Sequence, residues 1–219
     1  MALNLPERGV PNAAGLAAAL RACLRAAPDC TPSSPAPTLR PAAVLIPIVS
    51  RCDGNAVLFT RRAPTLTHHA GQICFPGGTV SAKDATYAQA ALRELEEETG
   101  IARRHVHLAG ALPALDTRTG FSVVPVVGVI EDGFRLVLQE TEVASVFEIP
   151  LPYVLDRRNY QLRPMPDRDQ TRVFDIIQYG NDLIWGATAR MLVNLVAILN
   201  NVAPDLHKSL RATGGNCDF

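Results

Sequence analysis

The sequence lacks closely spaced cysteines and an excess of charge of either sign. Its five cysteines are far apart, and without a CxxC pair they support neither a zinc ribbon nor a dithiol redox motif. Basic and acidic residues both number 21, so the formal net charge is zero. This balance argues against a nucleic-acid partner, because such binding depends on a basic surface. We expect reduced thiols and a cytoplasmic location, the default for such a chain.

The sequence also has no secretory signal and no hydrophobic run of membrane-spanning length. The first residues show no basic segment followed by an apolar core. The most apolar long stretch, residues 184–199, contains Arg190 and Asn194 and is too short and too polar to span a bilayer. We therefore expect a soluble protein without a membrane partner. The sequence leaves the oligomeric state open, with a homodimer as one option.

Helical and strand patterns alternate irregularly along the 219 residues, and hairpin signals are frequent. This order predicts an α/β fold of the α+β kind, an α/β/α sandwich with a mixed sheet between helices. We divide the chain into an N-terminal helix and proline-rich arm (1–38), a main domain (39–203) and a C-terminal tail (204–219). The expected elements are a helix at 12–27, a linker at 28–41, strands at 42–50 and 55–62 joined through Asp53-Gly54, a helix from about Asp84 to Thr99 closed by Gly100, strands near 105–113 and 122–130, a short helix near 140–145, strands near 159–163 and 172–179, and an amphipathic helix at 184–200.

Three glutamates in the run RELEEETGI (93–101) give the strongest functional signal. Glu94, Glu97 and Glu98 fall within one narrow stripe of a helix that turns by about 100° per residue. Carboxylates spaced in this way repel one another, which costs an isolated helix about 0.2–0.5 kcal/mol per pair. A divalent cation would neutralise them, and Mg²⁺ commonly binds protein carboxylates and substrate phosphates together. The stripe therefore points to metal-assisted chemistry on a phosphate.

The alternative for this stripe is a solvated helix face held by ion pairs. The positions four residues after the three glutamates are Glu98, Ile101 and Ala102, and none of them supplies a cation. Arg93 can reach Glu97, which favours orientation of one carboxylate over neutralisation of three.

The segment GGTVSAKDATYAQAALRELEEETGI (77–101) resembles a Nudix box, whose general form is G-x5-E-x7-R-E-U-x-E-E-x-G-U, with U an aliphatic residue. The second half matches throughout. In the first half, Gly78 lies one residue farther from Arg93 than the general form specifies, and Ala85 stands where the first glutamate would be. This departure is similar to the coenzyme A pyrophosphatase branch of the Nudix hydrolases, in which an aspartate, here Asp84, takes the corresponding place.

The upstream segment LTHHAGQICFPGG (66–78) also resembles that branch, which carries a sequence close to L-R-x-H-x-G-Q-V-x-F-P-G-G. The resemblance continues through GFSVVPVVG (120–128), EVASVFEIPL (142–151) and IWGATARML (184–192). Thr67 and Ser81 depart from it, since the branch usually has arginine and aspartate there. Arg61 and Arg62 could compensate for the missing arginine, although arginines at strand edges are often plain surface residues.

The resemblance implies that Glu97 and Glu98 are the principal metal ligands. With Glu94 they would hold Mg²⁺ or Mn²⁺, and Arg93 would orient the carboxylates. Glu142 is a candidate for a further carboxylate or the general base, and its alternative reading is a glutamate that only begins a helix. The remaining candidates are on the substrate side: Arg61, Arg62, His69, Gln72, and Gly77 and Gly78, whose alternative reading is an ordinary tight turn.

The leading prediction is a divalent-metal-dependent Nudix pyrophosphatase that acts on coenzyme A or its derivatives. The resemblance implies 3′,5′-ADP and a 4′-phosphopantetheine moiety as products. The alternatives are the same chemistry on ADP-ribose or a dNTP, and a Nudix-like ligand sensor without catalysis. A zinc site at His68, His69 and Cys74 has little support, because no fourth ligand follows at a recognisable spacing.

Overall fold

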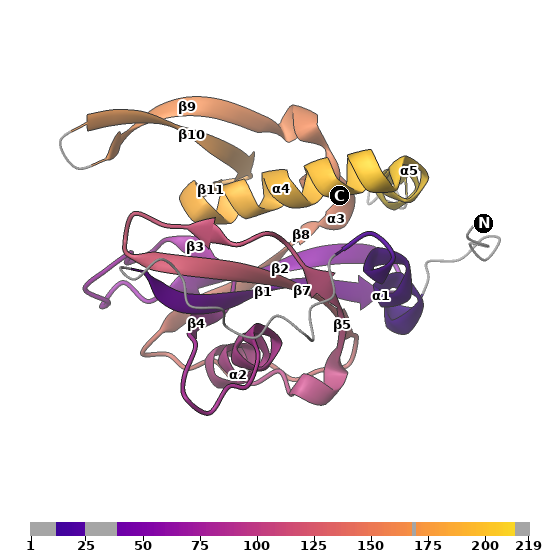
Figure 1. Cartoon of the computed structure of the whole chain (residues 1–219), viewed down its shortest axis with the longest axis horizontal. Helices are drawn as coiled ribbons and strands as arrows, with labels where there is room; N and C mark the ends of the chain where they lie inside the picture. The colour runs from indigo at the N-terminus through magenta and orange to yellow at the C-terminus, as the bar shows by residue number, and fades with distance from the viewer. Residues whose placement is uncertain (1–11, 25–38, 168–169, 213–219) are drawn as a thin grey trace.

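The apolar segment around residues 42–50 forms the middle of the largest sheet. A computed structural model describes residues 12–24, 39–167 and 170–212. In it, β1 (Arg40–Arg51) pairs antiparallel with β2 (Gly54–Arg62) and parallel with β7 (Phe121–Glu131). The order β3-β2-β1-β7-β5 makes this a mixed sheet, which β4, β6 and β8 extend (Figure 1). The bounds of the other strands are β3 (Ile73–Cys74), β4 (Gly77–Thr79), β5 (Val106–Ala111), β6 (Leu115–Asp116), β8 (Val143–Pro150), β9 (Tyr160–Asp167), β10 (Gln170–Tyr179) and β11 (Asp182–Trp185).

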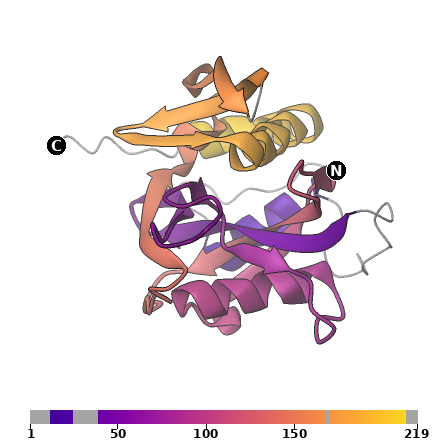
Figure 2. The same ribbon diagram turned by 90° about the vertical axis from the view of Figure 1, so that its left-hand side faces the viewer.

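Helices cover both faces of this sheet, as Figures 1 and 2 show. α2 (Tyr87–Thr99) lies on one face, and α1 (Ala13–Arg21), α3 (Leu151–Leu155), α4 (Gly186–Val202) and α5 (Pro204–Ala212) lie on the other. Alternate residues of β1 point to the two layers, so that Leu45 belongs to the core on the side of α2 and Ile46 to the core on the side of the other helices. Burial on both faces explains why β1 is apolar at nearly every position. The predicted α/β/α sandwich is confirmed.

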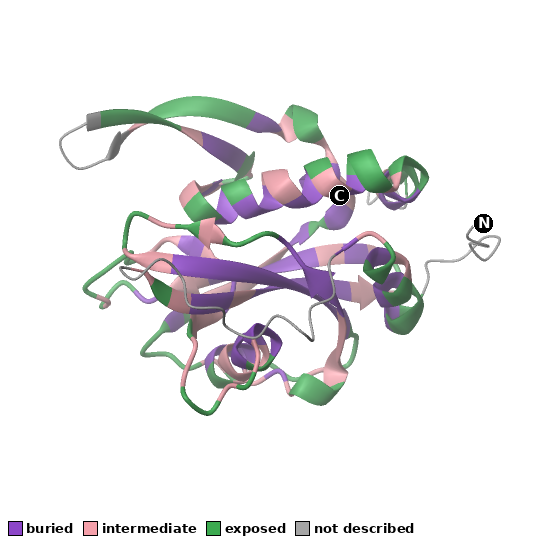
Figure 3. Ribbon diagram, in the orientation of Figure 1, coloured by how far each residue is buried: buried purple, intermediate pink, exposed green. Residues whose placement is uncertain are grey.

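A second, three-stranded sheet in the order β11-β10-β9 stands beside α4 (Figure 1). Its base packs into the core through Tyr160, Ile177 and Ile184. Farther out the β9–β10 hairpin is mostly exposed, as Figure 3 shows, and Leu162 and Val173 are 67% and 62% exposed. The hairpin therefore projects from the sandwich above the edge where β3 and β4 lie.

The predicted hairpin and the predicted end of the central helix are confirmed. β1 and β2 form the predicted antiparallel hairpin, in which Arg51 pairs with Gly54. Gly100 ends α2 in the left-handed conformation at φ 74°, and its N–H donates to the carbonyl of Glu96. A residue with a side chain would be strained at this φ, which is why glycine suits the position. Ile101, directly after it, is fully buried.

Two sequence predictions near the site are wrong. The short helix near 140–145 does not exist, since those residues form a turn that leads into β8. The central helix begins at Tyr87 and not at Asp84, because the side chain of Thr86 caps it and accepts a hydrogen bond from the Gln89 N–H.

The chain ends also differ from expectation. α1 ends at Arg21, and the part of the predicted helix and linker that spans 25–38 lies outside the described residues. Residues 182–185 form β11, so α4 begins only at Gly186. The segment expected as a tail contains α5, which buries Leu206 and Leu210 in the main core. Among the described residues, none of the helices combines the length and the apolar character needed to cross a membrane.

Candidate active site

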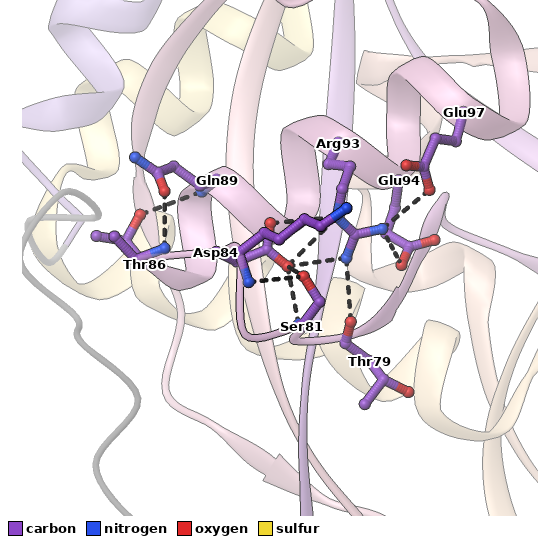
Figure 4. A network of polar contacts seen from close by, with 10 residues as sticks. Thr79, Ser81, Asp84, Thr86, Gln89, Arg93, Glu94 and Glu97 are labelled. Atoms are coloured by element: carbon purple, nitrogen blue, oxygen red, sulfur yellow. Dashed lines mark hydrogen bonds and ion pairs between the residues drawn. The ribbon is translucent and has the colours of Figure 1, made fainter.

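The turn before α2 is organised around Asp84. One carboxylate oxygen, Oδ2, accepts hydrogen bonds from the backbone N–H and the hydroxyl of Ser81, both at 2.9 Å. Next to it, the Gln89 side chain accepts from the backbone N–H of Ala85 at 2.8 Å, while the backbone N–H of Gln89 donates to the hydroxyl of Thr86 (Figure 4). These reciprocal bonds satisfy the free N–H groups at the helix start. They fix Asp84 relative to α2, where it faces Arg93.

Arg93 uses all three guanidinium nitrogens to join the turn to the helix (Figure 4). Nε and Nη2 donate to Asp84, Nη2 also donates to the carbonyl of Thr79 at 3.1 Å, and Nη1 donates to Glu94 and Glu97 at 2.9 Å each. The hydrogen bond from Arg93 is the main reason that the pKa of Asp84 falls to about 2. Arg93 therefore holds two of the three predicted metal ligands in place.

The three glutamates of the stripe lie at very different depths. The side chain of Glu97 is 59% exposed and that of Glu94 is 15% exposed, whereas Glu98 is only 4% exposed. One oxygen of Glu98, Oε2, is buried without a hydrogen-bond partner. Burial, and then the charge of Glu94, raise the pKa of Glu98 to about 8. Burial also raises the pKa of Glu94. A buried carboxylate of this kind must hold a proton or meet a cation.

Glu142 is close enough to act on these carboxylates. Its charge contributes to the raised pKa of Glu94 and of Glu98. It sits in the turn before β8, where its carbonyl accepts from the N–H of Ala63 at 2.8 Å. The alternative reading, in which Glu142 only begins a helix, is wrong because no helix forms there. The structure brings Glu142 to the same acidic cluster from a separate part of the chain.

Gly77 and Gly78 form β4, which pairs antiparallel with Ala43 and Val44 of β1. The backbone N–H of Gly77 hydrogen-bonds Glu98 and partly offsets the rise in its pKa. A Cβ atom on Gly77 would lie 2.5 Å from the carbonyl oxygen of Ala43. A Cβ atom on Gly78 would lie 2.5 Å from Oε1 of Glu94. A side chain at Gly77 would collide with the backbone of β1, whereas one at Gly78 would meet only the carboxylate end of Glu94. Both residues lie in a strand, so the alternative of an ordinary tight turn does not describe them.

The two glycines should respond differently to alanine. Gly77→Ala forces two backbones apart, so we expect a loss of folding stability of about 2–4 kcal/mol. Gly78→Ala meets only the mobile end of Glu94, so the fold should survive while the displaced carboxylate costs at least about tenfold in turnover. Urea denaturation and steady-state kinetics on both variants check this. Equal loss of stability in the two variants would contradict the distinction.

A cavity of about 630 Å³ opens beside this cluster, between the upstream segment and the start of α4. Its lining includes four of the predicted substrate-side residues: Arg62, His69, Gln72 and Gly77. The His69 ring shares a hydrogen bond of 2.8 Å with the Gln72 side chain. The charge of Arg62 lowers the pKa of Glu98, so this arginine lies between the cavity and the acidic cluster.

Arg61 does not line this cavity. Its guanidinium pairs with Asp182 of β11 and donates to the carbonyl of Gly71. It therefore ties the edge of the large sheet to the three-stranded sheet. Arg61 and Arg62 are neighbours at an irregularity of β2, and their different partners separate their roles.

The sequence did not predict the residues that form the far wall of the cavity. That wall is built by the loop 115–119, by β10 and by the first turn of α4. It includes the edge-to-face pair of Phe174 and Trp185, whose ring centroids are 5.6 Å apart. Nothing in the spacing of these segments predicts that they meet. The matching string IWGATARML was the one available signal, because it extends the branch resemblance to residues 184–192.

The residues of the cluster fit a divalent cation bound by oxygen atoms. Glu98 has an unpartnered buried oxygen, and Gly78 leaves space directly in front of the Glu94 carboxylate. In the present side-chain arrangement of residues 12–24, 39–167 and 170–212, no three Asp, Glu, His or Cys side chains are placed to hold one ion together. This applies equally to the zinc alternative at His68, His69 and Cys74. Arg93 occupies the space between Glu94 and Glu97, so an ion shared by these two requires Glu97 to turn.

Comparisons with known proteins give the family of the chain. The NUDIX domain family model matches residues 39–171. An uncharacterized Nudix hydrolase NudL of Citrobacter koseri is 42% identical over 71% of this chain and 81% of its own length. The protein of the same description from Klebsiella pneumoniae strain 342 is 41% identical over 75% of this chain and 85% of its own.

A solved structure supports the fold. The MutT/nudix family protein from Enterococcus faecalis superposes with a TM-score of 0.51, at 15% identity, over 82% of this chain and 67% of its own. At this identity the likeness concerns only the arrangement of the helices and strands. The sequence relatives and the family match carry the assignment further: the chain belongs to the Nudix family, and it is a pyrophosphatase of that family.

Proposed function

We propose that this pyrophosphatase uses Mg²⁺ or Mn²⁺ to cleave the diphosphate of coenzyme A or its derivatives, giving 3′,5′-ADP and a 4′-phosphopantetheine product. One observation supports this most strongly. Arg62 and Gly77 line the cavity and also act on Glu98, the buried carboxylate with an unpartnered oxygen. A substrate in the cavity would therefore meet a cationic side chain immediately before the acidic cluster.

Glu94, Glu97 and Glu98 would hold the divalent ion, in agreement with the requirement of the family for such metals. When bound, the ion supplies Lewis acidity to the diphosphate and lowers the pKa of water. Arg93 keeps Glu94 oriented through Nη1 while Asp84 anchors its other nitrogens. The backbone of Gly77 and Gly78 lets phosphate oxygens approach without a side chain in the way.

Glu142 would act as a further carboxylate or as the general base. It reaches the cluster from the turn before β8 and is exposed, so a water molecule has access to it. Glu142 lies outside the hydrogen-bond network of Arg93, and as an exposed carboxylate it could pass a proton taken from the attacking water to bulk solvent.

The substrate class rests on the upstream segment. Four of its matched or neighbouring residues (Arg62, His69, Gln72 and Gly77) share one cavity wall, as expected if the segment recognises the substrate. The alternatives keep the same cluster and change only the ligand, to ADP-ribose or a dNTP. A sensor without catalysis is disfavoured because all three box glutamates are retained and one of them is buried at an energetic cost.

A substrate panel tests the proposal directly. The purified chain with Mg²⁺, and separately with Mn²⁺, is given coenzyme A, acetyl-coenzyme A, ADP-ribose and a dNTP at equal concentrations. We expect the highest kcat/KM for a coenzyme A compound, with 3′,5′-ADP identified by chromatography. Preferential turnover of ADP-ribose or the dNTP would reject the substrate class and leave the pyrophosphatase chemistry standing.

A further inference from the structure

The connection between β7 and β8, residues 132–142, lies across the end of α2 and is joined to it by backbone hydrogen bonds. The N–H of Val137 donates to the carbonyl of Thr99 at 2.8 Å. The N–H of Gln139 donates to the carbonyl of Glu98 at 3.1 Å. The last four carbonyl groups of a helix have no partner within it, so the connection supplies two of them with donors. It therefore attaches to the backbone of the residue whose side chain is the buried carboxylate of the acidic cluster.

Gly100 allows this connection to approach the helix so closely. A Cβ atom on Gly100 would lie 2.8 Å from the Cβ atom of Val137 and 2.9 Å from its backbone nitrogen. Separations this short do not occur between real side chains and their neighbours, so a side chain at Gly100 would push Val137 away from Thr99. Gly100 thus ends α2 in the left-handed conformation and also leaves the space in which the connection packs.

Glu142, the last residue of the connection, is held from two sides. Its N–H donates to the carbonyl of Gln139 at 2.8 Å, so a short turn links it to the residue that is bonded to Glu98. Its own carbonyl accepts from the N–H of Ala63 at 2.8 Å, directly after β2. Pairing of β8 with β2 begins only at the next residue and secures Glu142 from that side alone. The turn to Gln139 secures it from the side of α2.

We propose that the backbone N–H groups of Val137 and Gln139, bonded to the end of α2, hold Glu142 in its working position beside the metal ligands. This rests on the proposed function, in which Glu142 is a further carboxylate or the general base. Val137 and Gln139 are then positioning residues that act through Glu142. Both hydrogen bonds end on the helix that carries Glu98, so they keep a constant spacing between that ligand and Glu142.

Two substitutions at Gln139 test the proposal. Gln139→Pro removes the N–H that donates to Glu98, whereas Gln139→Ala keeps this N–H and removes only an exposed side chain. Kinetics use the substrate of the panel with the highest turnover. We expect the proline variant to lose about 10- to 100-fold in kcat with KM changed less than about twofold, because the displaced group acts on the reaction. The alanine control should stay within about twofold in both values. Thermal unfolding should show both variants folded.

A second pair of variants tests the same contact from the side of the helix. Gly100→Ala and Gly133→Ala both place alanine at a positive φ, 74° and 88°. A Cβ atom on Gly133 meets nothing within 4 Å, whereas one on Gly100 meets Val137. We expect Gly100→Ala to lose kcat to a similar extent as the proline variant, and Gly133→Ala to stay within about twofold of the wild type. Equal kinetics in the two alanine variants would contradict the contact with Val137.

A double-mutant cycle with Glu142→Gln separates positioning from a general loss of structure. Glu142→Gln alone should lower kcat about 100-fold or more. In that background Gln139→Pro should cost less than about threefold, because the group that it displaces no longer functions. Losses that multiply would overturn the positioning role and leave Glu142 in the proposed function. Turnover of Glu142→Gln near that of the wild type would reject both. If the cycle holds with a substrate other than coenzyme A, the proposed substrate class fails and the positioning role stands.

Discussion

Glu98→Gln should reduce turnover by at least about 1,000-fold while leaving the fold intact. Glutamine keeps the shape of the side chain but cannot carry the negative charge that the divalent ion requires. The same variant should be more stable than the wild type in metal-free solution at alkaline pH. Glu98 is buried with an unpartnered oxygen, and its charged form is unfavourable without a cation. Activity and metal-free stability are therefore expected to change in opposite directions.

The pH dependence of this stabilisation follows from the raised pKa of Glu98. In the folded chain the pKa is about 8, against an ordinary value of 4.5. Below the ordinary value the carboxyl is protonated in both states, so the two proteins should be equally stable. As pH rises towards 8, only the unfolded wild type releases the proton, and the folded wild type loses stability on the order of 5 kcal/mol. The advantage of the glutamine variant should be full above pH 8.

Thermal unfolding in a chelator between pH 5 and pH 9, together with kinetics in Mg²⁺, measures both effects. Glu96→Gln is the matched control, because Glu96 lies on the same helix but pairs with Arg103 on the exposed side. It should change turnover and stability little. A Glu98→Gln protein with turnover near that of the wild type would remove Glu98 from the metal site. A stability difference independent of pH would contradict the raised pKa.

Arg93→Lys should cost about 100-fold in kcat and on the order of 2 kcal/mol in folding stability at neutral pH. Arg93 donates to Asp84, Glu94, Glu97 and the carbonyl of Thr79 with three nitrogens at once. A lysine ammonium is a single point and cannot span these acceptors. Both the turn before α2 and the orientation of Glu94 should loosen.

The loss of stability caused by Arg93→Lys should also depend on pH. It should shrink at acidic pH, where Asp84 becomes protonated. The pKa of Asp84 is lowered to about 2 from an ordinary 3.8, mainly by Arg93. The stabilisation is therefore complete above the ordinary value and disappears as pH falls through about 2. Urea denaturation at pH 7 and pH 3 should show a smaller difference at pH 3. Arg103→Lys, at an exposed pair, is the control. An unchanged urea midpoint for Arg93→Lys would refute the anchoring role.

The spacing of the glutamates in sequence predicts their common stripe but not their depth. Helical periodicity gives only the direction of each side chain around the axis. Whether Glu98 is buried depends on β4 and on Gly77, which lie outside the helix. The approach of Glu142 likewise depends on β8 pairing with β2 along its length. These contacts join segments that are far apart in the sequence, so local patterns cannot reveal them.

The fold was predictable where local signals were strong. The apolar run of β1, the hairpin to β2 and the glycine at the end of α2 follow from local rules that tertiary packing did not override. β11 was missed because its apolar residues run directly into those of α4, and Gly186 at φ 67° separates the two. α5 is short and mostly polar, and it is stabilised by the burial of Leu206 and Leu210 against the core.

The parallel pairing of β1 with β7 has a consequence for how the molecule folds. The pairs run from Arg40–Phe121 to Ser50–Glu131, so some eighty residues separate the partners. Closing so large a loop is slow, and a chain emerging from the ribosome makes the hairpin and the glutamate helix long before β7 is available. During that interval β1 lacks its central neighbour and exposes an apolar edge. Protection of nascent β1 by a chaperone would thus matter most between the synthesis of the Nudix box and that of residue 131.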